Sequence, residues 1–295
     1  MSDIVLTAET GSDIPPELAE KYGIYLVPMH VSFGSETLDD GSFPAERIFE
    51  YYAAAKEIPR TSACSPGDFS NVFDAVRSAQ PGKHILHLAY SAVTTSSYQN
   101  ALLSASEYPP GTITSFDTAQ VSVGQAAVVI KTAQLLKEHP GLPLDEVIKA
   151  VSRLCRQIHM CFLPDDLEYL RAGGRVSNAA YMGSRILNMR PCIEIIGGVL
   201  TAAKKYRGSL RKAAPRLIRE YTQKYGFNKD CLYLVRTAGL DADVCEAAET
   251  EAKECGFREI LWIQAGCVIT VHGGPGCIGL AGFSDAGAAE YGAGI

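Results

Sequence analysis

Short apolar runs alternate with amphipathic stretches along the first half of the chain. The apolar runs at residues 4–7, 85–90 and 112–116 predict buried strands, and residues 24–33 predict a longer extended segment. Apolar positions at helical spacing predict helices at residues 16–22, 44–56, 68–79, 97–107 and 120–139. Strands that alternate with helices are typical of a mostly parallel sheet covered on both faces.

One of these helices carries a clear start signal. Ser65 is a preferred N-cap residue, and Pro66 stands at the first helical position, where its missing N–H costs nothing. Asp68 stands at the position that completes a capping box with Ser65. We therefore expect the helix to begin at this Ser-Pro step.

The second half follows a break at residues 139–143, His-Pro-Gly-Leu-Pro. A helix at 144–159 is expected to bridge the halves, and further helices are expected at 182–188 and 210–225. Strands are predicted at 193–196, 231–236, 259–264 and 268–272, with a strand-like run at 277–283. The sequence thus predicts an α/β protein with domains at 1–160 and 161–284 and a flexible Ala/Gly-rich tail at 285–295.

Charge and composition limit the kinds of partner and the cellular compartment that we expect. The 295 residues carry a net charge of −6, which argues against nucleic acid or an acidic membrane surface as the main partner. No apolar run reaches the length of about 18 residues that predicts a membrane span, and the N-terminus lacks the features of a signal peptide. The nine cysteines are odd in number and include no Cys-x-x-Cys motif, which favours reduced thiols in the cytoplasm. The histidines do not have the spacing of a metal site, since His84 and His87 would face opposite sides of a strand.

Hydroxyl-rich loops are the first candidate for chemistry. Four loops precede helices and lie at or near strand ends, at residues 8–13, 61–65, 91–96 and 117–118. Ligands of open parallel sheets bind beyond the carboxyl ends of the strands, and helix N-termini attract anions. Thr61, Ser62 and Ser91 are therefore candidate anion ligands, although each loop taken alone could be a simple helix cap.

Basic residues in glycine-rich settings are the second candidate. Arg175 follows Gly173 and Gly174, and His272 opens a His-Gly-Gly-Pro-Gly segment at the end of a predicted strand. A basic cluster is formed by Lys204, Lys205 and Arg207. Each has an ordinary alternative, respectively a surface salt bridge, a satisfied turn histidine and a solvated face.

Three familiar motifs do not apply. The Gly-x-Gly-x-x-Gly match at 274–279 contains proline and leads into a strand, so it is not a dinucleotide fingerprint. The turn around Ser91 lacks both glycines of a nucleophile elbow, and no phosphate-binding P-loop sequence is present. The sequence therefore offers no nucleotide site.

Several short segments, taken in order, resemble the DegV family across nearly the whole chain. They are a Thr-Ser-x-x-Ser-Pro segment at 61–66, a Ser-rich turn ending in Tyr-Gln-x-Ala at 91–101, Leu-x-Tyr-Leu-x-x-Gly-Gly-Arg at 167–175, Lys-x-Arg at 205–207, and His-x-Gly-Pro-Gly at 272–276. The sequence departs from the family pattern at residues 8–11, Ala-Glu-Thr-Gly, and at Ala92, where a second serine is usual.

The resemblance implies a two-domain carrier, not an enzyme, that binds one long-chain fatty acid in an apolar tunnel and uses no other cofactor. It implies that Thr61, Ser91, Arg175 and His272, with Ser62 beside Thr61, hold the carboxylate. It also implies that the acid is presented to a separate fatty-acid kinase, which Arg207 would help to contact.

Two other functions remain open at this point. Ser91, on a strand-to-helix turn, could be the nucleophile of an acyl hydrolase with His272 as its base. The hydroxyl loops would also suit a binding or sensory module for another small anion.

Overall fold

The computed structural model describes residues 2–175 and 189–285. Its first sheet has the strand order β2-β1-β6-β7, and every neighbouring pair is parallel. The strands are β1 (Ile4–Glu9), β2 (Tyr25–Val27), β6 (His84–Ala89) and β7 (Ile113–Asp117). The parallel sheet that the alternating pattern predicts is confirmed.

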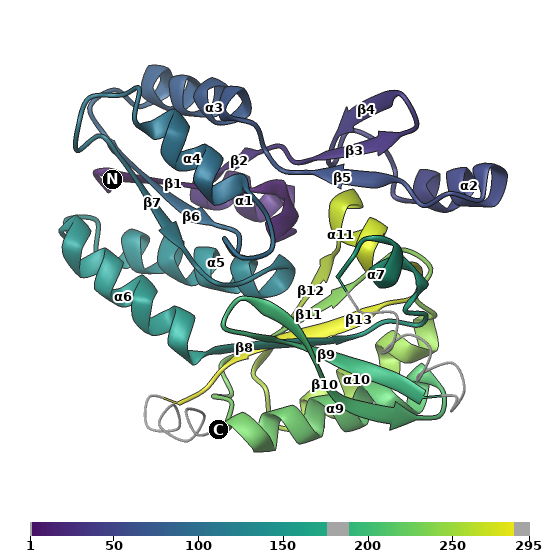
Figure 1. Cartoon of the computed structure of the whole chain (residues 1–295). Coiled ribbons are helices and arrows are strands. Elements are labelled where there is room, and N and C mark those ends of the chain that lie inside the picture. The colour runs from purple at the N-terminus through teal and green to yellow at the C-terminus, as the bar shows by residue number, and fades with distance from the viewer. Residues whose placement is uncertain (1, 176–188, 286–295) are drawn as a thin grey trace.

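Helices cover both faces of this sheet, as Figure 1 shows. Apart from α2 (Glu46–Ala55), which belongs to the small sheet described below, the α-helices of the first half are α1 (Pro16–Tyr22), α3 (Pro66–Ala79), α4 (Ser97–Ala105), α5 (Ser122–Glu138) and α6 (Leu144–Gln157). Helices α3 and α4 pack on one face, and α5 packs on the other. The Ser65–Asp68 capping box is formed, with the Asp68 N–H donating to Ser65 Oγ at 3.2 Å.

The second sheet is mixed and has the order β10-β9-β8-β13-β11-β12. Its strands are β8 (Ile158–Leu163), β9 (Met189–Ile196), β10 (Val199–Arg207), β11 (Cys231–Arg236), β12 (Glu259–Gln264) and β13 (Ile278–Phe283). Helices α9 (Leu210–Tyr225) and α10 (Ala242–Glu254) pack together, and α9 contacts one face of the sheet. Figure 1 places them on the side away from the first sheet.

Helix α5 lies between the two sheets. It contacts β1 and β6 of the first sheet and β8, β11 and β13 of the second. A helix with sheets on two sides has no need of a polar face, and most of α5 is buried, including Val123, Val128 and Val129. The two sheets therefore share one hydrophobic core, which runs from Leu6 through α5 to Tyr233.

A small antiparallel sheet projects from the first half toward the second. It has the order β4-β3-β5, with β3 (His30–Phe33), β4 (Glu36–Asp39) and β5 (Arg60–Ser62), and helix α2 (Glu46–Ala55) connects β4 to β5. This unit packs against α11 (Cys267–Gly273) in the second half. The rings of Phe49 and Tyr52 in α2 also contact Tyr169 of α7 (Glu168–Ala172).

The structure corrects two element predictions. Residues 268–272 were predicted as a strand because they form a short apolar run, but they belong to helix α11. The predicted helix at 144–159 ends at Gln157, because Ile158 begins strand β8 of the second sheet. The predicted helix at 182–188 lies outside the described residues, as do residues 286–295 of the predicted tail.

Candidate functional site

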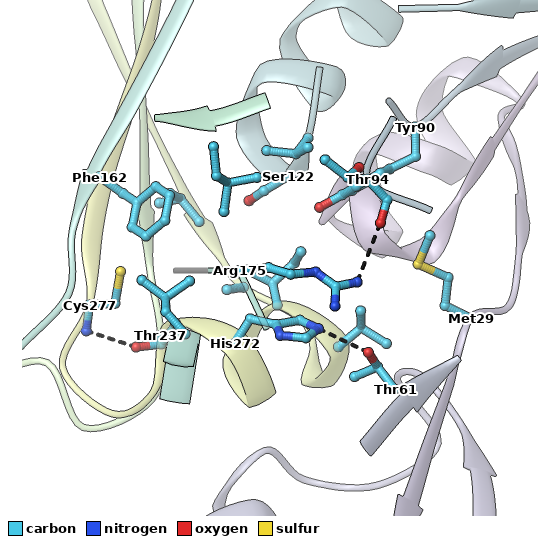
Figure 2. Close-up of a pocket in the computed structure, with 18 of the residues that line it drawn as sticks. Met29, Thr61, Tyr90, Thr94, Ser122, Phe162, Arg175, Thr237, His272 and Cys277 are labelled. Atoms are coloured by element: carbon cyan, nitrogen blue, oxygen red, sulfur yellow. Dashed lines mark hydrogen bonds between the residues drawn. The ribbon is translucent and has the colours of Figure 1, made fainter. Parts of the chain in front are cut away.

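A pocket opens between the two sheets and the small sheet. Its empty space, mouth included, is about 880 Å³. Most of its wall is apolar and comes from the core side of both halves: Val121, Met160, Phe162, Leu170, Leu200, Val235, Ala265, Val268, Ile269 and Cys277. Figure 2 shows Phe162 and Cys277 at one side of the pocket and Thr61 and Met29 at the other.

Thr61 and His272 meet at the polar end of this pocket. Thr61 lies on β5, and the pairing of Val31 with Thr61 in the small sheet fixes its position. Its hydroxyl lies 2.9 Å from Nε2 of His272, which projects from α11. This contact brings together two predicted site residues that are 211 positions apart in the chain.

Arg175 reaches the same place from the end of α7. Its guanidinium donates to the carbonyl oxygen of Gly173 at 2.5 Å and to that of Thr94 at 3.3 Å. In Figure 2 the guanidinium lies between Thr94 and the His272–Thr61 pair. Residue 173 must be glycine here, since a Cβ atom would lie only 2.3 Å from His272 Nδ1. The close approach of this turn to the imidazole thus depends on the Gly-Gly-Arg sequence.

The imidazole of His272 is held in its neutral form. Burial and, to a smaller extent, the nearby positive charge of Arg175 together lower the pKa of His272 to about 3. Its Nδ1 atom is buried and has no hydrogen-bond partner among the described residues. The polar end therefore presents one neutral imidazole, one hydroxyl and one permanent cation.

Two aspartate side chains from the first half hold the start of α11. Asp40 Oδ1 accepts the N–H groups of Cys267 at 2.7 Å and Val268 at 3.2 Å, and Asp13 Oδ1 accepts the N–H of Gly266 at 2.7 Å. Both carboxyl groups are buried, which raises the pKa of Asp40 and raises that of Asp13 to about 8. These contacts turn an apolar β-branched run into a helix and aim His272 into the pocket.

Ser91 occupies a different position from Thr61. It follows β6, is fully buried, and donates its hydroxyl to the carbonyl oxygen of Gly198 at 2.8 Å, in the turn between β9 and β10. The pocket wall is instead formed by its neighbours Tyr90, Thr94 and Thr95. The Ser91 hydroxyl therefore makes its hydrogen bond to Gly198, and the His272 ring makes its own to Thr61 through Nε2.

The other predicted residues divide between the pocket and the surface. Ser62 lines the pocket beside Thr61. Arg207 is exposed at the end of β10, opposite Met189, and does not line the pocket.

Sequence reasoning missed Tyr90, which lines the pocket, and Glu9, which positions it. The buried Glu9 carboxylate accepts the Tyr90 N–H at 2.9 Å and the Gln125 side-chain amide at 2.8 Å. Glu9 stands at the end of an apolar run, and this unusual place for a carboxylate was the signal in the sequence that could have identified its role.

The part of the chain that the structure describes contains no cluster of three or more His, Cys, Asp or Glu side chains able to hold a metal ion. None of its helices is long and apolar enough to cross a membrane. The glycine-rich segment at 274–279 leads into β13, as predicted.

The fold and the pocket define a class: an α/β protein whose two sheets enclose an apolar cavity that ends in a hydroxyl, an imidazole and a guanidinium. The sequence model of a family described as "Uncharacterised protein, DegV family" matches residues 3–285. The chain therefore belongs to the DegV family.

Relatives of known sequence and structure agree with this assignment. A DegV domain-containing protein of Deinococcus radiodurans is 27% identical over 281 residues, covering 94% of this chain and 97% of that protein. A fatty-acid-binding DegV family protein from Thermus thermophilus is 29% identical, with a TM-score of 0.85 over 96% of this chain and 99% of that one. The Streptococcus pneumoniae Fatty Acid Kinase (Fak) B3 protein, solved loaded with linoleic acid, shares the fold at 18% identity and a TM-score of 0.82, over 97% and 100% of the two chains.

Proposed function

We propose that this protein binds one long-chain fatty acid, with the acyl chain in the apolar pocket and the carboxylate at Thr61, Ser62, Arg175 and His272. The observation that carries the proposal is the pocket itself, an apolar cavity with a cation and hydroxyl groups at one end. The 29%-identical relative from Thermus thermophilus, described as fatty-acid-binding, supports the ligand class. Ser91 stays a predicted carboxylate ligand, and its hydroxyl would have to leave the Gly198 carbonyl to act as a donor.

The energetics suit a ligand with a long tail and one charged end. Each buried methylene contributes about 0.8 kcal/mol, so a tail of about 15 methylenes contributes on the order of 12 kcal/mol before the costs of binding. A carboxylate cannot be buried without donors or a positive partner. Arg175 provides the charge, and Thr61 and the neutral His272 provide hydrogen bonds.

We propose further that the bound acid is the phosphoryl acceptor of a separate fatty-acid kinase. In that reaction a carboxylate oxygen attacks the γ-phosphorus of a nucleoside triphosphate held by the kinase. The new C–O–P bond forms as the bond to the nucleoside diphosphate breaks. The sequence has no P-loop of its own, which is consistent with a carrier that leaves nucleotide binding to its partner. The exposed Arg207 would contact the kinase, so Arg207→Ala should slow acyl phosphate formation without changing fatty-acid binding.

Native mass spectrometry tests the carrier function. The purified protein should carry the added mass of one fatty acid, and the delipidated protein should regain that mass when it is mixed with oleate. Leu200→Trp places a large ring in the pocket wall and should reduce the fraction of protein that carries a fatty acid. Leu103→Trp, at an exposed site of α4, should leave that fraction unchanged. A wild-type protein that is empty and ignores added fatty acid would refute the proposal.

A further inference from the structure

A second hollow adjoins the polar end of the pocket, and we refer to it as the vestibule. Thr61, Arg175 and His272 line both spaces, so they form the boundary between them. The remaining wall comes from the segment after α2 in the first half and from α7 in the second. A carboxylate bound at Thr61 and His272 would thus have the apolar pocket on one side and the vestibule on the other.

The vestibule is rich in positive charge. Lys56, Arg60, Arg171 and Arg175 line it, against the two carboxylates of Glu57 and Glu168. Glu168 also accepts a hydrogen bond from the Tyr52 hydroxyl at 3.0 Å. Among the described residues, neither Lys56 nor Arg60 has an ion-pair partner. This local excess of positive charge contrasts with the net charge of −6 of the whole chain.

The fatty acid does not account for this charge. A fatty acid has a single negative charge, which Arg175 already meets at the boundary. Lys56, Arg60 and Arg171 stand beyond that point, on the side away from the acyl chain. Their arrangement suits a ligand with additional negative charge attached to the carboxylate end. Arginine side chains bind phosphate groups through bidentate hydrogen bonds.

We propose that the vestibule is the binding site for the phosphate group of an acyl phosphate. This proposal rests on the proposed carrier function and adds a second subsite to it. The phosphate is attached through one carboxylate oxygen, so it extends from the head-group position into the vestibule while the acyl chain keeps its place. The basic side chains then hold the doubly charged product after transfer.

Two matched ligands test this inference. Oleate probes the pocket alone, and a 2-oxoalkylphosphonate of the same chain length, in which CH₂ replaces the labile bridging oxygen, probes the pocket and the vestibule together. The double variant Lys56→Gln/Arg60→Gln and the single variant Arg171→Gln should each weaken phosphonate binding, the double variant by about tenfold or more. Oleate binding should change by less than about twofold, because these side chains lie outside the acyl pocket.

The double variant Lys83→Gln/Lys137→Gln removes the same charge from the opposite end of the first sheet and is the control. Salt dependence gives a second measurement that does not rely on variants: wild-type affinity should fall more steeply with salt for the phosphonate than for oleate. Equal losses for both ligands, or no loss for the phosphonate, would overturn the vestibule site. A wild-type protein that binds neither ligand would instead overturn the carrier function on which the site rests.

Discussion

Thr61 and Ser91 present the same pattern in the sequence and take different roles in the structure. Both are hydroxyl residues of the first half that lie near the start of a helix, and both contact the second half. Thr61 faces a side chain, the imidazole of His272, at the boundary of two hollows. Ser91 faces backbone, the Gly198 carbonyl at the tip of the β9–β10 hairpin, and is sealed from solvent.

The difference lies in what the second half places opposite each hydroxyl. A neutral imidazole can exchange its hydrogen bond for one with a ligand, because Thr61 and His272 both line the pocket. A backbone carbonyl in a tight turn has no such freedom. Gly198 has a φ of 82°, and a Cβ atom there would lie 2.5 Å from Ser91 Oγ. Thr61 therefore lines the open pocket, while Ser91 holds the hairpin that carries Leu200 into the pocket wall.

The largest effect is expected from Thr61→Val, which keeps the shape of the side chain and removes its hydroxyl. A hydrogen bond to a charged group contributes about 1.5–3 kcal/mol, so the dissociation constant for oleate should rise by about tenfold to a hundredfold. Thr61→Ser keeps the hydroxyl and should stay close to wild type. Fluorescent fatty-acid displacement measures both, and an unchanged affinity in Thr61→Val would remove this residue from the head-group site.

An intermediate effect is expected in the pH dependence of stability. His272 has a pKa of about 3 in the folded protein, against an ordinary value of 6.5. The unfolded chain thus binds more protons between these values, and stability must fall as the pH drops through 6.5 toward 3. Between pH 7 and pH 5 the ligand-free wild type should lose roughly 1–2 kcal/mol more than His272→Gln. Chemical denaturation at the two pH values measures the difference, and equal losses would mean that the imidazole is not held neutral.

The smallest effect on affinity is expected from Ser91→Ala. The variant leaves the Gly198 carbonyl unpaired and should reduce the free energy of unfolding by about 1 kcal/mol. Its affinity for oleate should change by no more than about threefold, because Ser91 does not line the pocket. A tenfold loss would show that the Ser91 hydroxyl turns to the carboxylate, as the sequence predicts, and the contrast with Thr61 would disappear.

The fold could be predicted from the sequence wherever local pattern decides it. The parallel sheet, the capped start of α3 and the long buried helix α5 all follow from periodicity and residue choice. Helix α11 could not be predicted in this way. Its apolar residues favour a strand, and the side chains of Asp13 and Asp40 that accept its first N–H groups stand more than 220 positions away.

The same limit applies to the candidate site. The sequence indicated Thr61, Arg175 and His272, because each stands in a distinctive short sequence segment, and the structure brings these three together. It could not distinguish Ser91 from its neighbours Thr94 and Thr95, since the choice depends on where the hairpin tip docks. The vestibule depends on Lys56 and Arg171, which meet only in the folded protein.

The anchoring of α11 also sets when the pocket can form during synthesis. Asp13, Asp40 and Thr61 are synthesised early, but their partners in the second half are synthesised much later. Gly266 is 253 positions from Asp13, and His272 is 211 positions from Thr61. Because domains fold in order during synthesis, a nascent chain can form its first sheet before the pocket exists. Once the halves have joined, a ligand that occupies the joint stabilises it by mass action. A bound lipid should therefore be found only in molecules whose two halves have packed together.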